Sequence, residues 1–175
     1  DNTNHVKIKR DKQLSQTLYG KVQNLKVLKI QLGLKCNMKC SYCAQSDRQF
    51  ETISSNERDV PKFIKMIIDN NITVSDCIQF WGGEPFVYWK ILVKLIPELR
   101  KLYPEITFAM ISNGTLLTKE KLDFLSKYNC CITFSHDGPG YHLRGKDPLD
   151  DPKMLELWKY AYKVLPHVSI NAVLS

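Results

Sequence analysis

The chain has 175 residues, the length of one ordinary domain, and 43% of them are hydrophobic, which is enough to form a buried core. It contains no run of about 18 apolar residues and its N-terminus is polar, so we expect neither a membrane span nor a signal peptide. The net charge of +7 comes from lysines spread along the chain, with no dense block beyond Lys7–Arg10, so nucleic-acid binding is not favoured over a solvated basic surface.

Residues 1–26 show no clear hydrophobic period, and we expect an N-terminal extension or a small hairpin there. From residue 27 onward, segments with a two-residue apolar period alternate with segments that have a helical period. The first kind predicts five strands, at residues 27–34, 77–81, 106–111, 130–134 and 168–174. The second kind predicts four helices, with the apolar stripes Val60-Phe63-Ile64-Ile67-Ile68, Leu92-Leu95-Ile96-Leu99-Leu102, Leu122-Leu125-Tyr128 and Leu155-Trp158-Tyr162-Leu165.

Capping residues predict where three of these helices begin. Ser54 and Glu57 have the spacing of a capping box. Thr118 is a suitable N-cap for the third helix, because its hydroxyl can accept a backbone N–H of the first turn. Asp151 as N-cap, followed by Pro152 at the first helical position, predicts the start of the fourth helix.

Strands and helices that alternate in this way predict an α/β domain with a parallel sheet, over residues 27–175. Because crossovers between parallel strands are right-handed, two architectures remain: a (β/α) barrel, whole or partial, and an open doubly wound sheet. The chain begins with Asp1 rather than Met, which favours a piece of a longer protein.

A chemically specialised loop follows each of the first four predicted strands. These loops are residues 36–43, 82–85, 112–115 and 135–140. The carboxyl ends of parallel strands meet at one edge of a sheet, which is where βα folds build their active sites. We therefore expect one functional site to which all four loops contribute.

Cys36, Cys40 and Cys43 form the loop with the strongest chemical signal. Thiolates bind iron–sulfur clusters and zinc, but a structural zinc site has four protein ligands, and no further Cys or His follows until Cys77. A four-iron cluster held by three cysteines leaves one iron open to a substrate or cofactor. A zinc site with a distant fourth ligand, His136 or Cys77, remains the alternative and would fit a non-enzymatic binding module.

The short cysteine spacing without a secretion signal is typical of metal binding in a reducing compartment, so we expect a cytoplasmic location. The remaining cysteines, Cys77, Cys130 and Cys131, lie among apolar residues. We expect these three to pack in the core.

Gly82 and Gly83 have no side-chain bulk, so a ligand could approach their backbone closely. Glu84 could then pair with a cationic group of that ligand. The alternative for this loop is a tight turn with a solvated carboxylate.

Polar side chains in the last two loops suit a ribose or an amino-acid moiety, although such residues also occur as turn and cap residues. They are Ser112, Asn113, Ser135 and Asp137. His136 and His142 are candidates for acid–base chemistry or ordinary loop residues, and Arg144 could bind a carboxylate or lie on the surface.

The segment Cys36-Asn-Met-Lys-Cys40-Ser-Tyr42-Cys43 matches the C-x3-C-x-aromatic-C signature of the radical S-adenosylmethionine (radical SAM) superfamily at every defined position. Gly82–Pro85 matches that family's Gly-Gly-Glu-Pro motif after the second strand. The chain from residue 27 onward thus resembles the radical SAM core, a partial parallel (β/α) barrel. The family core has six strands, whereas the sequence shows five βα units, so we expect the sixth to be missing.

The resemblance implies that the three cysteines ligate a [4Fe–4S] cluster and that SAM chelates the open iron. One electron from the cluster would cleave SAM into methionine and a 5′-deoxyadenosyl radical, which abstracts hydrogen from a substrate. The residues implied in SAM binding are Tyr42, Gly82, Gly83, Glu84, Ser112, Asn113, Ser135, Asp137, Arg144 and Asn171.

The segment Ser135-x-Asp-Gly-Pro139, with Arg144 shortly after it, resembles the subgroup that modifies peptides and proteins, including sulfatase-maturing and SPASM-type enzymes. This implies a peptide or protein substrate and an electron donor of the flavodoxin or reductase type. Radical chemistry on a small molecule, nucleotide or RNA is the alternative within the family.

Overall fold

The computed structural model describes residues 24–45 and 55–173. Its strands are β1 (Asn24–Gln31), β2 (Thr73–Trp81), β3 (Thr107–Ser112), β4 (Cys130–Ser135) and β5 (Val168–Asn171). The α-helices between them are α2 (Val60–Asp69), α3 (Trp89–Leu102), α4 (Lys119–Lys127) and α5 (Pro152–Val164). Short 3-10 helices follow β2 and β4, namely η2 (Pro85–Tyr88), η3 (Gly138–Leu143) and η4 (Pro148–Asp150).

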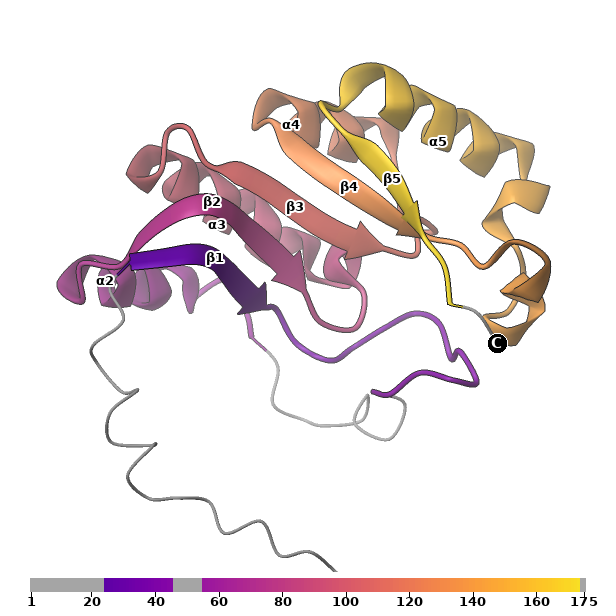
Figure 1. Cartoon of the computed structure of the whole chain (residues 1–175), viewed down its shortest axis with the longest axis horizontal. Helices are drawn as coiled ribbons and strands as arrows, with labels where there is room; N and C mark the ends of the chain where they lie inside the picture. The colour runs from indigo at the N-terminus through magenta and orange to yellow at the C-terminus, as the bar shows by residue number, and fades with distance from the viewer. Residues whose placement is uncertain (1–23, 46–54, 174–175) are drawn as a thin grey trace, which may run out of the picture.

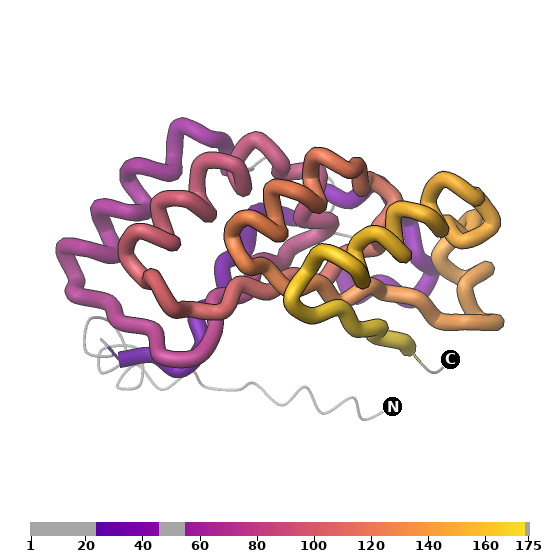
Figure 2. The backbone as a smooth tube through the Cα atoms, turned by 90° about the horizontal axis from the view of Figure 1, so that it is seen from above, coloured from indigo at the N-terminus to yellow at the C-terminus, as the bar shows by residue number. Residues whose placement is uncertain are grey.

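The strands form one parallel sheet in the order β1-β2-β3-β4-β5. The four α-helices lie in a row along one side of the strands (Figure 2). A doubly wound sheet would reverse its strand order and carry helices on both faces. The structure therefore confirms the α/β class and, of the two expected architectures, selects the partial barrel.

One face of each strand packs against the helices and forms the core. The buried strand residues on this face are Ile30, Ile78, Phe80, Phe108, Met110, Cys130, Ile132 and Phe134. The alternate residues point to the opposite face, because successive side chains of a strand alternate. On that opposite face Trp81 is 41% exposed and Ile111 is 49% exposed, so the inner side of the partial barrel is open among the described residues.

The observed strand bounds differ from the predicted ones by three or four residues at β1, β2 and β5, and by one residue at β3 and β4. β1 covers residues 24–31 rather than 27–34, because the chain turns at Gly33, whose φ of +147° ends the regular alternation. β2 begins at Thr73, where it pairs with Asn24, four residues earlier than predicted. β5 ends at Asn171 rather than at residue 174. Residues 24–26 of the expected extension belong to β1, and residues 1–23 lie outside the described part.

Two of the three predicted helix starts are confirmed. The Thr118 hydroxyl accepts the Lys121 N–H, and an Asp151 carboxylate oxygen accepts the Lys153 N–H at 2.9 Å. The predicted capping box is wrong for Glu57, because α2 starts only after Asp59; Ser54 lies outside the described residues.

The apolar stripes are confirmed for α3 and only in part for α2 and α5. Ile68, Leu155 and Tyr162 are 53%, 37% and 56% exposed, so they are not core residues. The buried residues of α5 are Trp158 and Ala161. Trp158 belongs to the predicted stripe, whereas Ala161 is too small to be noticed in a pattern of large apolar residues. The orientation of α5 on the sheet decides which side of a broad apolar stripe is buried.

Among residues 24–45 and 55–173, no helix is both long enough and apolar enough to cross a membrane. All five strands end on the same side of the molecule, where the loop after β1 and the connection from β4 to α5 also lie (Figure 1). The fold therefore brings the specialised loops to one edge of the sheet, as the sequence predicted.

Candidate active site

A hollow of about 200 Å³ lies at the carboxyl edge of the sheet and is lined by residues from all four specialised loops. The predicted site residues that line it are Cys36, Cys40, Cys43, Gly82, Gly83, Glu84, Ser112, Asn113, Ser135 and Arg144. Met38, Trp81 and Ile111 complete its wall. Tyr42 and Asp137 lie beside this group without lining the hollow, and Asn171 ends β5 next to Ser135 in the register of the sheet.

Backbone contacts from the β2 loop hold residues 33–35, which lead into the cysteine loop. The Gly33 oxygen accepts the Gly83 N–H, and the Lys35 oxygen accepts the Glu84 N–H, both at 2.9 Å. The Lys35 N–H in turn donates to the Tyr88 hydroxyl at 2.8 Å. These bonds immediately precede Cys36, so the Gly-Gly-Glu segment and the cysteine loop form one unit.

The two glycines of the β2 loop are required by this close approach. A Cβ atom on Gly82 would lie 2.2 Å from the Gly33 oxygen, and one on Gly83 would lie 2.2 Å from the Lys35 oxygen. Real Cβ atoms do not approach backbone atoms so closely, and Gly82 also has a φ of +146°. The sequence explains these glycines by the approach of a ligand to their backbone; the structure adds a second reason, because the backbone of the β1 loop fills the space where their Cβ atoms would be.

Glu84 is buried, with 1% of the residue exposed, so the alternative of a solvated carboxylate is wrong. Its side chain accepts three hydrogen bonds: from the Phe86 N–H at 3.0 Å, the Ser112 hydroxyl at 2.8 Å and the Asn113 N–H at 2.8 Å. Burial raises the pKa of Glu84, and the three hydrogen bonds partly oppose this shift. The carboxylate thus joins the β2 loop to the β3 loop.

The β3 loop contacts the cysteine loop through two asparagines. The side-chain N–H₂ of Asn113 donates to the Asn37 oxygen at 3.0 Å and lies 3.9 Å from the Cys36 sulfur. The Asn37 amide donates to the Thr115 hydroxyl at 2.7 Å. Asn113 therefore reaches a thiol of the cysteine loop from a strand two places away in the sheet.

All six cysteines lie within the described residues and carry free thiols. Burial raises the pKa of Cys36, and burial also raises the pKa of Cys40, where the charge of Arg144 acts in the opposite direction. Among the described residues, the three thiols of the loop are not gathered into a preformed metal site. Metal binding would have to remove their protons.

Two observations weigh against the zinc alternative. Both nitrogens of His136 already have partners, Asp147 and the Gly138 N–H. Cys77 pairs in register with Thr107, four residues before the end of β2. At about 3.3 Å per residue it lies roughly 13 Å along the strand from the edge that carries the hollow. Neither residue is placed to complete a zinc site with the cysteine loop.

The expected core role of the remaining cysteines is confirmed for Cys130, which is fully buried. Cys77 and Cys131 are only partly buried. They occupy strand positions that alternate with the core residues, so they belong to the inner face of the sheet rather than to the core.

Asp137 is the centre of a polar cluster behind the cysteine loop. It accepts hydrogen bonds from the Tyr42 hydroxyl and, at 2.9 Å, from the Val173 N–H; Arg144 Nη1 lies 3.5 Å from its carboxylate. Burial acts to raise the pKa of Asp137, but these bonds and the Arg144 charge bring it below its usual value. The pKa of Tyr42 is raised to about 12 by burial and by its bond to Asp137.

Arg144 has a side-chain donor that no described residue uses. Its side chain is 10% exposed, and within the described part of the chain its buried Nε has no hydrogen-bond partner. The guanidinium lies 5.8 Å from the ring centre of Tyr42 and 5.7 Å from that of Tyr141. Because a buried donor without a partner is costly, this geometry fits an anionic ligand in the hollow.

Sequence reasoning missed Gly33, Tyr88, Asn37 and Asp147. Gly33 stands between a predicted strand and the cysteine motif, a signal that could have indicated a close backbone approach. Asp147 precedes Pro148, as Asp151 precedes Pro152, but this capping signal does not predict its contact with His136. Tyr88 and Asn37 carry no local signal, because their partners are distant in the sequence; Tyr88 and Lys35, for example, are 53 residues apart.

A sequence model of the Radical SAM superfamily matches residues 30–173. The radical SAM cyclopropyl synthase TigE of Paramaledivibacter caminithermalis is 27% identical, over 87% of this chain and 36% of its own length. The serine-type anaerobic sulfatase-maturating enzyme of Bacteroides thetaiotaomicron is 31% identical, over 62% of this chain and 28% of its own. A GTP 3′,8-cyclase of Campylobacter curvus is 31% identical, over 57% of this chain and 30% of its own.

Among solved structures, anSMEcpe with bound AdoMet superposes with a TM-score of 0.68 at 26% identity, over 87% of this chain and 44% of that one. Native anSMEcpe with bound AdoMet and Cp18Cys peptide gives a TM-score of 0.66 at 26% identity, over 85% of this chain and 43% of that one. The chain thus spans less than half the length of these proteins. The family match covers most of its residues, and the chain belongs to the radical SAM superfamily, whose members use SAM and a [4Fe–4S] cluster.

Proposed function

We propose that Cys36, Cys40 and Cys43 hold a [4Fe–4S] cluster and that the adjoining hollow binds SAM. The bound cluster would supply one electron for reductive cleavage of SAM into methionine and a 5′-deoxyadenosyl radical, which takes a hydrogen atom from the substrate. The observation that carries the proposal is the shared hollow. Three cysteines, the Gly-Gly-Glu segment and Arg144 line the same space, and the Nε of Arg144 has no partner among residues 24–45 and 55–173.

We assign the SAM carboxylate to Arg144, because this residue lines the hollow and its Nε has no hydrogen-bond partner among the described residues. We assign the SAM amino group to the backbone of Gly82–Glu84, because the Glu84 carboxylate is already committed to three protein donors. Asp137 acts behind the site, where it holds Tyr42 and Arg144.

The remaining assignments concern the adenosine part of SAM. Tyr42 is assigned to the adenine side. The candidates for ribose or carboxylate contacts are Ser112, Asn113, Ser135 and Asn171. Ser112 and Asn113 are already bonded to Glu84, so Ser135 is the most available of these groups in the hollow.

A peptide or protein is the substrate class that the relatives favour. One relative is named a sulfatase-maturating enzyme, and a sulfatase is a protein. The structure of anSMEcpe contains a bound peptide. The open inner face of the sheet, where Trp81 and Ile111 are exposed, offers an apolar surface beside the hollow. The likeness to GTP 3′,8-cyclases supports a nucleotide substrate as the second candidate.

The electron must come from a partner protein, which we propose to be of the flavodoxin or reductase type. The net charge of +7 would favour association with an acidic partner. Cysteines that bind a cluster must stay reduced, which a reducing compartment favours. The cytoplasmic location expected from the sequence therefore remains our prediction.

Anaerobic reconstitution with iron and sulfide, followed by reduction with dithionite in the presence of SAM, tests the proposal. We expect about four irons per chain and equimolar methionine and 5′-deoxyadenosine. The Cys40→Ala variant should lose both the cluster and the cleavage, whereas Cys131→Ala, a partly buried cysteine outside the hollow, should retain them. A protein that binds zinc in place of iron, or holds the cluster without cleaving SAM, would refute the proposal.

Separate incubations of the reconstituted protein with each candidate substrate distinguish the two substrate classes. One set of incubations contains SAM, reductant and a peptide whose sequence comes from a sulfatase or a precursor peptide. Another contains SAM, reductant and GTP. The proposed class predicts faster release of 5′-deoxyadenosine and a mass change in a peptide. Stimulation by GTP alone, with conversion of GTP, would select the nucleotide candidate.

A further inference from the structure

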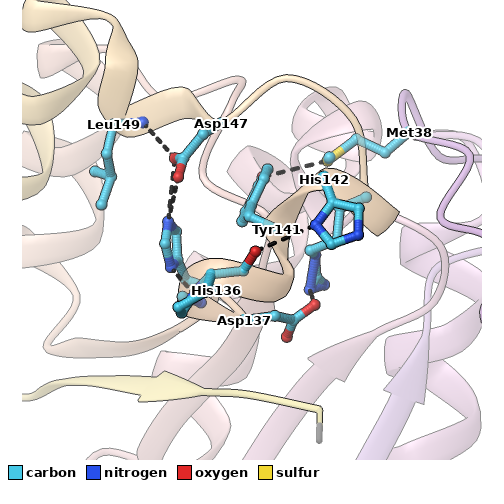
Figure 3. A network of polar contacts seen from close by, with 10 residues as sticks. Met38, His136, Asp137, Tyr141, His142, Asp147 and Leu149 are labelled. Carbon is cyan, nitrogen blue, oxygen red and sulfur yellow. Dashed lines mark hydrogen bonds and ion pairs between the residues drawn. The ribbon is translucent and has the colours of Figure 1, made fainter. Parts of the chain in front are cut away.

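His136 and Asp147 join the two ends of the loop that follows β4. The imidazole Nε2 lies 3.1 Å from each carboxylate oxygen of Asp147. The His136 side chain is 12% exposed and that of Asp147 is 27% exposed, so the contact is largely shielded from water. Figure 3 shows the two side chains facing each other, with both contacts dashed.

Both ring nitrogens of His136 have partners, which fixes the tautomer. The Gly138 N–H donates to Nδ1 at 3.1 Å, so Nδ1 is the acceptor and the proton of the neutral ring resides on Nε2. Nε2 therefore donates to Asp147. Oδ1 of Asp147 also accepts the Leu149 N–H at 2.8 Å and so begins η4. The pair thus connects the turn at Gly138, where the loop begins, to the turn at Leu149, where it ends.

Aromatic packing anchors the imidazole to the core. The ring lies 4.6 Å from the ring centre of Tyr141 and 5.9 Å, edge to face, from that of Trp158 on α5. Trp158 is itself stacked on Phe134 of β4 at 4.1 Å. The His136 backbone N–H donates to the Asn171 oxygen at 2.9 Å, which connects the same point to β5.

The segment between the two residues carries Asp137 and Arg144 and lies against the cysteine loop. The Leu143 oxygen accepts the Ser41 N–H at 2.9 Å, between two of the cysteines. The Tyr141 hydroxyl lies 3.9 Å from the sulfur of Met38. The position of Arg144 beside Tyr42 therefore depends on how this segment is held.

We propose that His136 and Asp147 are positioning residues that form a latch, which holds residues 137–146 against the cysteine loop and presents Arg144 to the ligand of the hollow. His136 then acts neither as an acid or base nor as a metal ligand. The role in ligand binding rests on the proposed function, whereas the role in holding the segment does not. A side chain that is held in place before binding loses less freedom on binding, so the latch should strengthen SAM binding.

Four variants separate the latch from a general effect of mutation. His136→Asn keeps an acceptor near Gly138 but is too short to reach Asp147, whereas His136→Gln is long enough to reach it. Asp147→Ala removes the partner. His142→Asn is the matched control, because His142 lies in the same loop, is exposed, and has the Pro139 oxygen as its one hydrogen-bond partner among the described residues.

Two measurements on these variants test the proposal. Hydrogen exchange of the metal-free protein reports the opening of residues 136–150 against that of the sheet, and equilibrium dialysis of the reconstituted protein reports the Kd for SAM. We expect faster exchange confined to residues 136–150 and a rise of about tenfold or more in Kd for His136→Asn and Asp147→Ala. His136→Gln should restore most of both properties, and His142→Asn should match the wild type.

Unchanged exchange in residues 136–150 of both disruptive variants would overturn the latch. Faster exchange with an unchanged Kd for SAM would overturn its positioning role and leave a purely structural contact. Exchange that rises throughout the sheet would also refute it, because the pair would then support the whole domain. Failure of the wild type to bind SAM would refute the proposed function, and the exchange measurement would still decide whether the latch exists.

Discussion

The backbone oxygen of Gly33 occupies the space next to Gly82, 2.2 Å from where a Cβ atom on Gly82 would be. This contact joins the end of β1 to the end of β2 directly before Cys36. The shape of the cysteine loop therefore depends on a glycine 46 positions after Cys36 in the sequence.

Gly82→Ala should force the β1 loop away from the β2 loop. We expect a loss of about 2–4 kcal/mol in the free energy of unfolding, because overpacking adds to strain at a positive φ. Urea denaturation measures this loss, and iron content after reconstitution reports the cysteine loop. Gly138→Ala is the control: Gly138 also has a positive φ, +56°, but has open space around it, so about 1–2 kcal/mol is expected. Equal losses in the two variants would contradict the close-approach explanation.

Glu84→Ala should destabilise the domain strongly, because it leaves three donors of the β2 and β3 loops without their acceptor. We expect a loss of about 3 kcal/mol in urea denaturation, and a smaller loss for Glu84→Gln, which keeps one acceptor oxygen. Glu98→Gln, which removes only an exposed ion pair with Lys101, should change stability by less than about 1 kcal/mol. A loss for Glu84→Ala no larger than that of the control would be inconsistent with the role of this carboxylate.

The raised pKa of Glu84 predicts a particular pH dependence. For an acid whose folded pKa exceeds that of the unfolded chain, about 4.3, the contribution is present below that value and is lost as the pH rises through the folded pKa. The stability difference between wild type and Glu84→Gln should therefore shift in favour of the wild type as the pH falls. Urea denaturation of both proteins from pH 7 to pH 4 checks the sign.

Asp137 should show the opposite behaviour, because its pKa is lowered. Its contribution is present above the unfolded pKa, about 3.9, and is lost as the pH falls through the lower folded value. The advantage of wild type over Asp137→Asn should be largest near neutral pH and shrink in acid. An advantage that grows in acid would show that Asp137 is not ionised in the folded protein.

Arg100 connects the beginnings of β3 and β4, and within the described part of the chain it has no carboxylate partner. Its guanidinium donates to the Pro104, Ile106 and Tyr128 oxygens at 2.7–2.8 Å and lies 4.3 Å from the ring centre of Phe108. Arg100→Ala should cost about 3 kcal/mol in thermal or urea unfolding, since three carbonyl groups lose a charged donor. Arg58→Ala, at an exposed position, should be neutral within about 0.5 kcal/mol.

The sequence by itself determined the class of fold and the centre of the site. Apolar periods of two and of about 3.6 residues are local properties, so they predicted a parallel α/β sheet with its loops at one edge. The cysteine spacing and the Gly-Gly-Glu-Pro segment are also local, and they indicated the radical SAM superfamily, which the family match confirms.

Only the tertiary structure decided how these parts depend on one another. It placed Glu84 among the donors of the β3 loop rather than in solvent, gave Gly82 and Gly83 a backbone neighbour, and buried Ala161 in place of Leu155. It also paired His136 with Asp147, a contact that no pattern in the sequence indicates. The physical reason is the same in each case: burial and hydrogen bonding depend on which distant segment lies opposite, and a local pattern does not contain that information.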